Sequence, residues 1–202
     1  MENQQIKLAI VYYSSTGTNY QMAQWAKAEA QKNGAEVRLV KVKELVPESV
    51  FASNPAWKAN ADATKDIPEA TSDDLVWADA ILFSAPSRYG TLPAQMKYFI
   101  DGQGPIWAQG KLVNKVVSGM SSAQNVHGGQ EATILSLYTN MYHWGAIIVS
   151  PGYTDPVLYT TGGNPYGAST QVDQNAKILD NVQPAVEVQV RRMLDIAGKL
   201  KY

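Results

Sequence analysis

Short apolar runs alternate along the chain with segments whose apolar residues recur at helical spacing. Five runs rich in Val, Ile, Leu and Ala predict buried strands, at 6–13, 35–42, 79–85, 115–120 and 145–150. Helical spacing predicts helices at 20–32, 71–77, 91–101, 130–144 and 182–200. Because the apolar runs are continuous, they are typical of a parallel sheet that is covered on both faces. We therefore predict an α/β fold, a doubly wound five-stranded parallel sheet with helices on both faces.

The helical spacing also predicts which side chains face the core. In the helix at 91–101 the inward face consists of Leu92, Met96, Phe99 and Ile100. In the helix at 130–144 the expected inward stripe consists of Ile134, Leu135, Tyr138, Met141 and Tyr142. Both helices should pack on the sheet through these residues.

Two long stretches interrupt the alternation of strands and helices. The stretch at 43–72 contains three prolines, with Phe51 and Trp57 as apolar residues that should pin it to the surface. The stretch at 151–175 is rich in Gly, Tyr, Thr and Pro. We expect both to be irregular insertions, which at this length are usually functional or packed on the surface, and we expect a further loop at 102–110. No repeat or composition break divides the chain, so we predict a single domain over residues 1–202.

Composition and charge narrow the classes of function. The 202 residues suffice for one domain with a full core, and a formal net charge of −1 gives no basic surface for nucleic acid. No apolar run reaches the ~20 residues of a membrane span, and no secretory signal precedes the first strand, so we expect a cytoplasmic protein without membrane insertion. The chain has no cysteine, and His127 and His143 are not spaced as a metal pair, so we expect no metal site.

The clearest candidate site is the loop after the first predicted strand. It consists of six small polar residues, Ser14, Ser15, Thr16, Gly17, Thr18 and Asn19. Free N–H groups at the start of a helix bind anions, phosphate above all, and the hydroxyls add donors. Neither glycine motif for dinucleotides or nucleoside triphosphates is present, so the loop suits a monophosphate on a larger ligand. The alternative is a plain N-cap without a ligand.

Two further loops end neighbouring strands. In an open parallel sheet such loops gather at one edge, where ligands bind. The loop at 86–90 offers the Arg88 guanidinium beside the Tyr89 ring, which together could flank a flat, charged ring. The loop at 121–129 offers backbone and side-chain amides for a ring edge. Each loop alone is typical of an ordinary polar turn, but together the three loops indicate a planar ligand with one phosphate.

Several motifs resemble one family of proteins. Ser-x-Thr-Gly-Thr-Asn after the first strand resembles the phosphate loop of flavodoxin-like proteins. Other motifs resemble, in order, those of the WrbA family of FMN-dependent NAD(P)H:quinone oxidoreductases, at 86–90, 95–101, 107–112, 121–122, 128–131, 143–145, 151–153 and 162–169. The resemblance covers nearly the whole chain, although the first loop is closer to that of plain flavodoxins and the third is one residue longer.

The resemblance implies a flavodoxin-like fold, FMN as cofactor, and two-electron transfer from NAD(P)H to quinones in a homo-oligomer, often a tetramer. It implies that His143, contributed across a subunit interface, and Trp107 line the substrate cavity, with His143 also beside the cofactor. Arg88 or third-loop N–H groups would stabilise the reduced cofactor at its pyrimidine edge. The expected cofactor-binding residues are Ser14, Ser15, Thr16, Gly17, Thr18, Asn19, Pro86, Ser87, Arg88, Tyr89, Gly90, Ser121, Ser122, Ala123, Gln124, Asn125, Gly128, Gly129 and His143.

Two other functions compete with this interpretation. A flavodoxin-type electron carrier would bind FMN without a nicotinamide site, but such carriers are usually strongly acidic, unlike this chain. A hydrolase would need the sequence at 119–123, Gly-Met-Ser-Ser-Ala, to act as a nucleophile elbow with His127 or His143 as base. Ala123 stands where the elbow has glycine, and no acid follows in an obvious place. Without the resemblance, His143 would be expected to be a hydrogen-bonded histidine at a helix end, and Trp107 and Trp57 would be expected to be packing residues.

Overall fold

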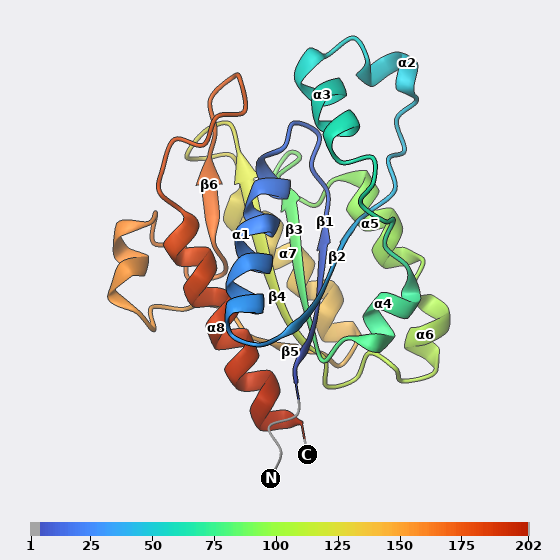
Figure 1. Cartoon of the computed structure of the whole chain (residues 1–202), viewed down its shortest axis with the longest axis vertical. Coiled ribbons are helices and arrows are strands. Elements are labelled where there is room, and N and C mark those ends of the chain that lie inside the picture. The colour runs from blue at the N-terminus through green and yellow to red at the C-terminus, as the bar shows by residue number, and fades with distance from the viewer. Residues whose placement is uncertain (1–4, 202) are drawn as a thin grey trace.

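The computed structural model describes residues 5–201 and shows a parallel sheet between two layers of helices (Figure 1). The strands are β1 (Lys7–Tyr12), β2 (Glu36–Lys41), β3 (Ala80–Pro86), β4 (Val116–Ala123) and β5 (Ile147–Ile148). They pair in parallel in the order β2-β1-β3-β4-β5. This is the flavodoxin-like order of a doubly wound sheet, so the predicted fold class and five predicted strands are confirmed.

Helices cover both faces of the sheet because successive strand residues point to opposite sides. Leu8 and Ile10 of β1 join the core beneath α1 (Thr18–Lys32) and α8 (Gln183–Leu200). Ala9 and Val11 join the core on the other face, beneath α4 (Ser72–Trp77), α5 (Ala94–Asp101) and α7 (Gln130–His143). Among residues 5–201, no helix combines the length and apolar character needed to cross a bilayer.

Helices form in two stretches where irregular structure was predicted. The stretch at 43–72 contains α2 (Glu48–Phe51) and α3 (Pro55–Ala63), and the expected loop at 102–110 contains α6 (Gly104–Ala108). Pro55 stands in the first turn of α3, where a helix needs no N–H donor, and Asn54 Oδ1 accepts the Trp57 N–H at 3.1 Å. The prediction was wrong here because these prolines begin helices and do not interrupt them.

The second insertion adds a sixth strand that the sequence pattern did not predict. It contains the 3₁₀-helix η1 (Pro156–Thr160) and the short strand β6 (Ser169–Gln171). β5 pairs with the start of β4 and β6 pairs with its end, so β4 has two successive neighbours. Between them, the Gly119 N–H donates to Tyr138 Oη at 3.1 Å, and the Gly119 carbonyl accepts from Gln189 Nε2 at 2.8 Å. Side chains from α7 and α8 thus replace the missing strand partner.

The predicted inward stripe of α7 was partly wrong. Ile134, Tyr138 and Met141 are buried, but Leu135 is 43% exposed and Tyr142 is 68% exposed. The buried face of α7 passes through Thr133 and Leu137 and not through these two residues. They therefore leave apolar side chains on the outer surface of the helix.

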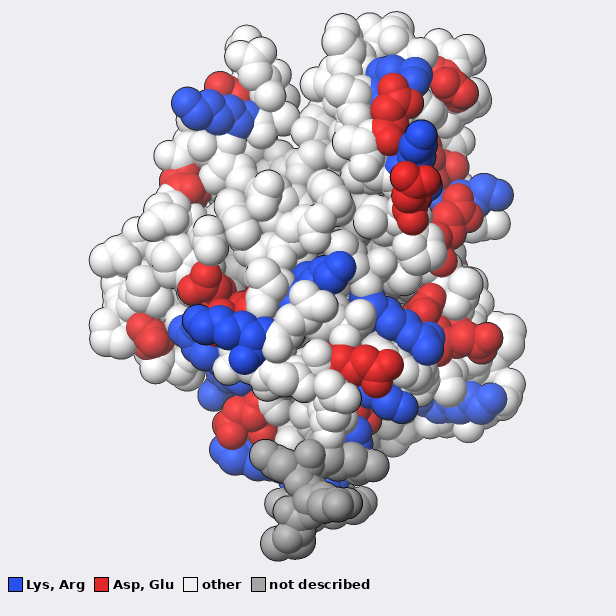
Figure 2. Space-filling view, viewed as in Figure 1, with Lys and Arg blue, Asp and Glu red and all other residues white. Residues whose placement is uncertain are grey.

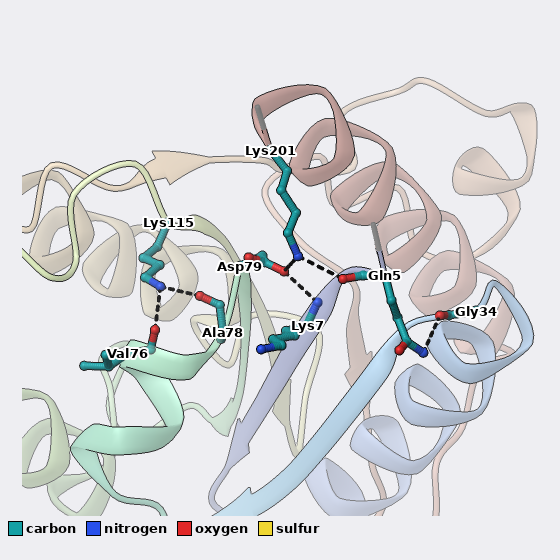
Figure 3. Close-up of polar contacts among 8 residues, drawn as sticks. All are labelled: Gln5, Lys7, Gly34, Val76, Ala78, Asp79, Lys115 and Lys201. Carbon is teal, nitrogen blue, oxygen red and sulfur yellow. Dashed lines mark hydrogen bonds and ion pairs between the residues drawn. The ribbon is translucent and has the colours of Figure 1, made fainter. Parts of the chain in front are cut away.

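The edge of the sheet at the amino ends of the strands is closed by two lysines (Figure 3). Lys201 Nζ donates to Asp79 Oδ2 at 2.7 Å, and the same oxygen accepts the Lys7 N–H at 2.8 Å, which ties the end of the chain to the start of the sheet. Lys115 Nζ donates to the carbonyls of Val76 and Ala78 at the end of α4. Burial lowers the pKa of the Lys115 ammonium. These contacts indicate that this edge of the sheet serves to stabilise the fold.

An ion pair between the buried Glu29 of α1 and the half-exposed Arg191 of α8 is expected to make stability depend on pH. Glu29 is buried, and although burial alone would raise its pKa, hydrogen bonds from Arg191 and Asn33 keep that pKa below its usual value. A lowered carboxyl pKa in the folded state adds stability above the unfolded pKa, and this stability is lost as pH falls through the folded pKa.

We expect Arg191→Ala to lower the free energy of unfolding by about 2 kcal/mol at pH 7, because it leaves the carboxylate with fewer donors. The difference from the wild-type protein should shrink as pH falls below about 4.5. Urea unfolding across this range measures it, and a difference that stays constant down to pH 3 contradicts the assignment.

Candidate functional site

A cavity of about 590 Å³ lies at the edge where the strands end, as predicted for an open parallel sheet. Its walls come from the three predicted loops and from both insertions. Figure 2 shows this edge as a notch between two projections, and the surface inside the notch carries almost no charge in that view. The volume falls within the roughly 300–1,000 Å³ that is typical of small-molecule sites.

The first loop presents free N–H groups at the start of α1. Ser14 Oγ accepts the Gly17 N–H at 3.0 Å, and Gly17 adopts a φ of 97°, which closes the turn. Within residues 5–201, the backbone N–H groups of Ser15, Thr16 and Thr18 donate to no acceptor. The loop at 14–19, the predicted anion-binding loop, thus offers three free amides and the adjacent hydroxyls at a helix N-terminus, which are the donors that an anion site needs.

Asn19 joins the first loop to two strands. Its Nδ2 donates to Ser84 Oγ at 3.1 Å, and its Oδ1 accepts from Ser122 Oγ at 2.7 Å. All three side chains are buried. Asn19 also belongs to the cavity lining, but its side-chain amide is already paired, so its side chain holds the loop against β3 and β4.

The second loop reaches across to the first. Arg88 Nη2 donates to Ser15 Oγ at 3.1 Å, which places the guanidinium beside the anion-binding loop. Ser87 Oγ donates to the Gly128 carbonyl at 2.6 Å and so fixes the second loop to the third. Tyr89 is fully exposed at the rim. The structure thus places Arg88 near the expected phosphate, whereas the sequence interpretation had placed it at a ring edge.

The third loop starts later than predicted, because β4 continues to Ala123. Ser121 and Ser122 are therefore strand residues, and the Ser121 side chain is fully buried. Ser121 cannot act as an exposed nucleophile on a sharp turn, so the hydrolase alternative loses its central residue.

The third loop also contacts the second loop closely. Gly129 packs so closely on Gly90 that a Cβ at this position would lie 2.5 Å from the Gly90 Cα.

Most of the predicted cofactor residues line one cavity. Those that do so are Ser14, Ser15, Thr16, Thr18, Asn19, Pro86, Ser87, Arg88, Tyr89, Ser122, Ala123, Gln124, Asn125 and Gly128. Gly17, Gly90, Ser121, Gly129 and His143 do not line it. Of these five, the three glycines shape the loops through their positive φ angles.

The two insertions supply lining residues that sequence reasoning did not assign. They are Asn54, Ala56, Trp57, Val172, Gln174 and Asn175, and Ala176 directly after the second insertion also lines the cavity. The first insertion is tied to the anion-binding loop by Asn60 Nδ2, which donates to the Ser14 carbonyl at 2.7 Å. The second is tied to it by Thr18 Oγ1, which donates to the Ala176 carbonyl at 3.4 Å. The unusual length of both insertions was the only sequence signal that pointed to them.

His143 and Trp107 lie together but far from this cavity. Trp107 Nε1 donates to the His143 carbonyl at 2.8 Å, and both side chains line a separate surface pocket. α7 begins beside the third loop and ends at His143, so its length of about 20 Å separates His143 from the main cavity of the same chain.

The donors around the main cavity fit the phosphate and polar ring of FMN. Its lining includes the Arg88 guanidinium, hydroxyls, amides and free backbone N–H groups, and it includes no Asp or Glu. Such a set favours an anionic ligand, since no carboxylate opposes the phosphate. Within residues 5–201, no three metal-ligating side chains come together.

Comparisons with known proteins agree with this geometry. The family model described as NADPH-dependent FMN reductase matches residues 6–154. A Deinococcus radiodurans protein named NAD(P)H dehydrogenase (quinone) is 52% identical over 96% of this chain and 97% of its own length. A Syntrophobacter fumaroxidans protein of the same name is 39% identical over 96% and 98%. A WrbA-like flavodoxin structure from Agrobacterium tumefaciens aligns with a TM-score of 0.69 at 20% identity, over 98% of this chain and 100% of that one. The chain belongs to the family of NADPH-dependent FMN reductases.

Proposed function

We propose that this protein is an FMN-dependent NAD(P)H:quinone oxidoreductase. Relatives that align over nearly their whole length carry the name NAD(P)H dehydrogenase (quinone). When bound, FMN would supply the redox chemistry, which is two-electron transfer from NAD(P)H to a quinone. The observation that carries the proposal is the anion-binding loop in a cavity without a carboxylate.

The chain's own residues bind and orient the cofactor in this proposal. The N–H groups and hydroxyls of the first loop hold the phosphate, and the Arg88 guanidinium neutralises part of its charge. The loops at 86–90 and 121–129 flank the ring, and the N–H groups of the third loop supply donors at its pyrimidine edge. The lining at Gln124 and Asn125 adds side-chain amides for the same edge.

Replacing Arg88 with Ala is expected to weaken FMN binding between tenfold and a hundredfold, since it removes a charge-assisted contact to the phosphate. Fluorescence titration of the apoprotein with FMN measures the change. Arg192→Ala, which removes an exposed arginine on α8 that donates only to the Ser150 carbonyl, is the matched control. Wild-type affinity in the Arg88 variant contradicts this role.

We further propose that His143 and Trp107 act at the substrate cavity of a neighbouring subunit in a homo-oligomer, and that the oligomer is a tetramer. The distance of His143 from the cavity of its own chain supports this arrangement. Exposed apolar side chains add support. They lie on or next to the helices α5, α6 and α7, which cover one face of the sheet, at Tyr98, Trp107, Val113, Leu135 and Tyr142. Light scattering after gel filtration measures the mass of the particle and so tests the tetramer. We also propose that the protein is cytoplasmic.

A steady-state assay tests the activity. NADH oxidation should require both FMN and benzoquinone, and it should consume one quinone for each NADH. A His143→Ala variant should bind FMN normally but lose quinone turnover. FMN-loaded wild-type protein that oxidises no NADH in the presence of quinone would show that the proposed activity is wrong.

A further inference from the structure

A second cavity of about 140 Å³ lies beside the anion-binding loop, where β2 ends and beneath α3. It shares Ser14 and Trp57 with the larger cavity. The two cavities therefore lie next to each other, on either side of these two residues. The proposed FMN site does not account for this space.

Part of the lining is aromatic and fixed in place. Phe51 and Trp57 stack with ring centroids 5.8 Å apart and 28° between their planes. The hydrogen bond from Asn60 to the Ser14 carbonyl holds the helix that carries Trp57 against the anion-binding loop. A preformed aromatic face of this kind suits a nucleobase, because every base offers a π face for stacking.

Another part of the lining carries a hydroxyl without a partner. Tyr12 is only 2% exposed, and within residues 5–201 its Oη lies beside the Thr64 side chain but makes no hydrogen bond of good geometry. Buried polar groups are nearly always paired, so an unpaired hydroxyl in a cavity wall points to a ligand or water that pairs with it. The ring nitrogens of a purine offer suitable acceptors.

The charges around the cavity disfavour an additional phosphate. Its lining holds one ammonium, Lys41, and two carboxylates, Glu44 and Glu69. Lys41 Nζ donates to the Thr64 carbonyl at 2.6 Å, and Glu44 accepts from Tyr13 Oη at 2.9 Å. A carboxylate near the ribose favours a free 2′-hydroxyl over a 2′-phosphate.

We propose that this cavity is the adenosine subsite for the nicotinamide donor, a role that rests on the proposed function. Trp57 stacks on the adenine and the Tyr12 hydroxyl bonds to its edge. Glu69 opposes a 2′-phosphate, so the protein prefers NADH to NADPH.

Reduced nicotinamide mononucleotide provides the test, because it carries the same hydride but no adenosine. The measured quantity is the ratio of kcat/KM for NADH to kcat/KM for the mononucleotide. Trp57→Ala should lower this ratio about tenfold, the effect of one lost base stack. Trp77→Ala, which removes a tryptophan from α4 at the opposite edge of the sheet, should leave the ratio unchanged. Glu69→Gln should raise the kcat/KM for NADPH relative to that for NADH severalfold.

Tyr12→Phe distinguishes a role of the Tyr12 hydroxyl in binding the donor from a role in packing the protein core. Removal of an unpaired buried hydroxyl leaves the melting temperature unchanged or higher, whereas the ratio should fall severalfold if the hydroxyl bonds to adenine. A ratio that stays at the wild-type value in both the Trp57 and the Tyr12 variants overturns the subsite while leaving the flavin reaction intact. Wild-type protein that binds FAD more than tenfold tighter than FMN would overturn the assignment to the donor, because the adenosine would then belong to the flavin. If neither NADH nor NADPH reduces bound FMN, the proposed function is wrong, and the proposed adenosine subsite is wrong with it.

Discussion

Replacing Gln189 with Leu is expected to lower the melting temperature by roughly 10 °C, the largest stability effect that we predict for a single side chain. Gln189 is fully buried in α8, where its Nε2 donates to Ser118 Oγ at 2.6 Å and to the Gly119 carbonyl at 2.8 Å. Its Oε1 accepts the Ala168 N–H at 2.7 Å. Leucine fills a similar volume but leaves the Gly119 carbonyl, the Ala168 N–H and the Ser118 hydroxyl without Gln189 as partner, at a cost of about 3 kcal/mol.

The same substitution should also weaken FMN binding. Ala168 directly precedes β6, and the chain after β6 supplies Val172, Gln174, Asn175 and Ala176 to the cavity wall. Thermal unfolding and FMN titration measure the two effects. Gln183→Leu, which replaces an exposed glutamine on the same helix, is the control and should change neither quantity. A Gln189→Leu melting temperature within 2 °C of that of the control contradicts the assigned network.

Asn19→Ala is expected to raise the dissociation constant of FMN at least tenfold and to cost about 2–3 kcal/mol of stability. The substitution leaves the hydroxyls of Ser84 and Ser122 buried without the Asn19 amide as partner. It also releases the start of α1 from β3 and β4, so the N–H groups of the anion-binding loop lose their fixed direction. Preorganised donors bind an anion better than mobile ones, which explains why binding and stability should fall together.

Gln21→Ala on the exposed side of the same helix is the matched control for Asn19→Ala. Titration of each apoprotein with FMN, together with urea unfolding, separates the two effects. If the Asn19 variant binds FMN as tightly as the Gln21 variant does, the link between the loop and the two strands does not determine affinity.

The sheet and the three loops could be predicted from the sequence because their signals are local. The strands β1 and β3 are nearly continuous apolar runs, and the run that forms β1 ends abruptly at Ser14. Once the strands are parallel, the position of their carboxyl ends at one edge follows from topology alone. This is why residues as distant in sequence as Ser15, Arg88 and Asn125 were correctly grouped.

The cavity walls could not be predicted because they depend on contacts between distant segments. Trp57 reaches the site through the bond from Asn60 to Ser14, and Ala176 reaches it through Thr18. β6 is only three residues long and exists because the end of β4 offers it a free edge. Short elements of this kind carry almost no periodicity of their own. The sequence pattern also could not predict which side of α7 faces solvent, because Leu135 and Tyr142 are apolar yet exposed.

An anaerobic absorption titration tests the central claim most directly. The protein is loaded with FMN, titrated with NADH and then with benzoquinone, while the visible flavin spectrum is recorded. We predict that one equivalent of NADH bleaches the spectrum and that one equivalent of quinone restores it fully, as two-electron transfer requires. A loaded protein whose spectrum NADH and NADPH both leave unchanged would be an electron carrier and not the oxidoreductase proposed here.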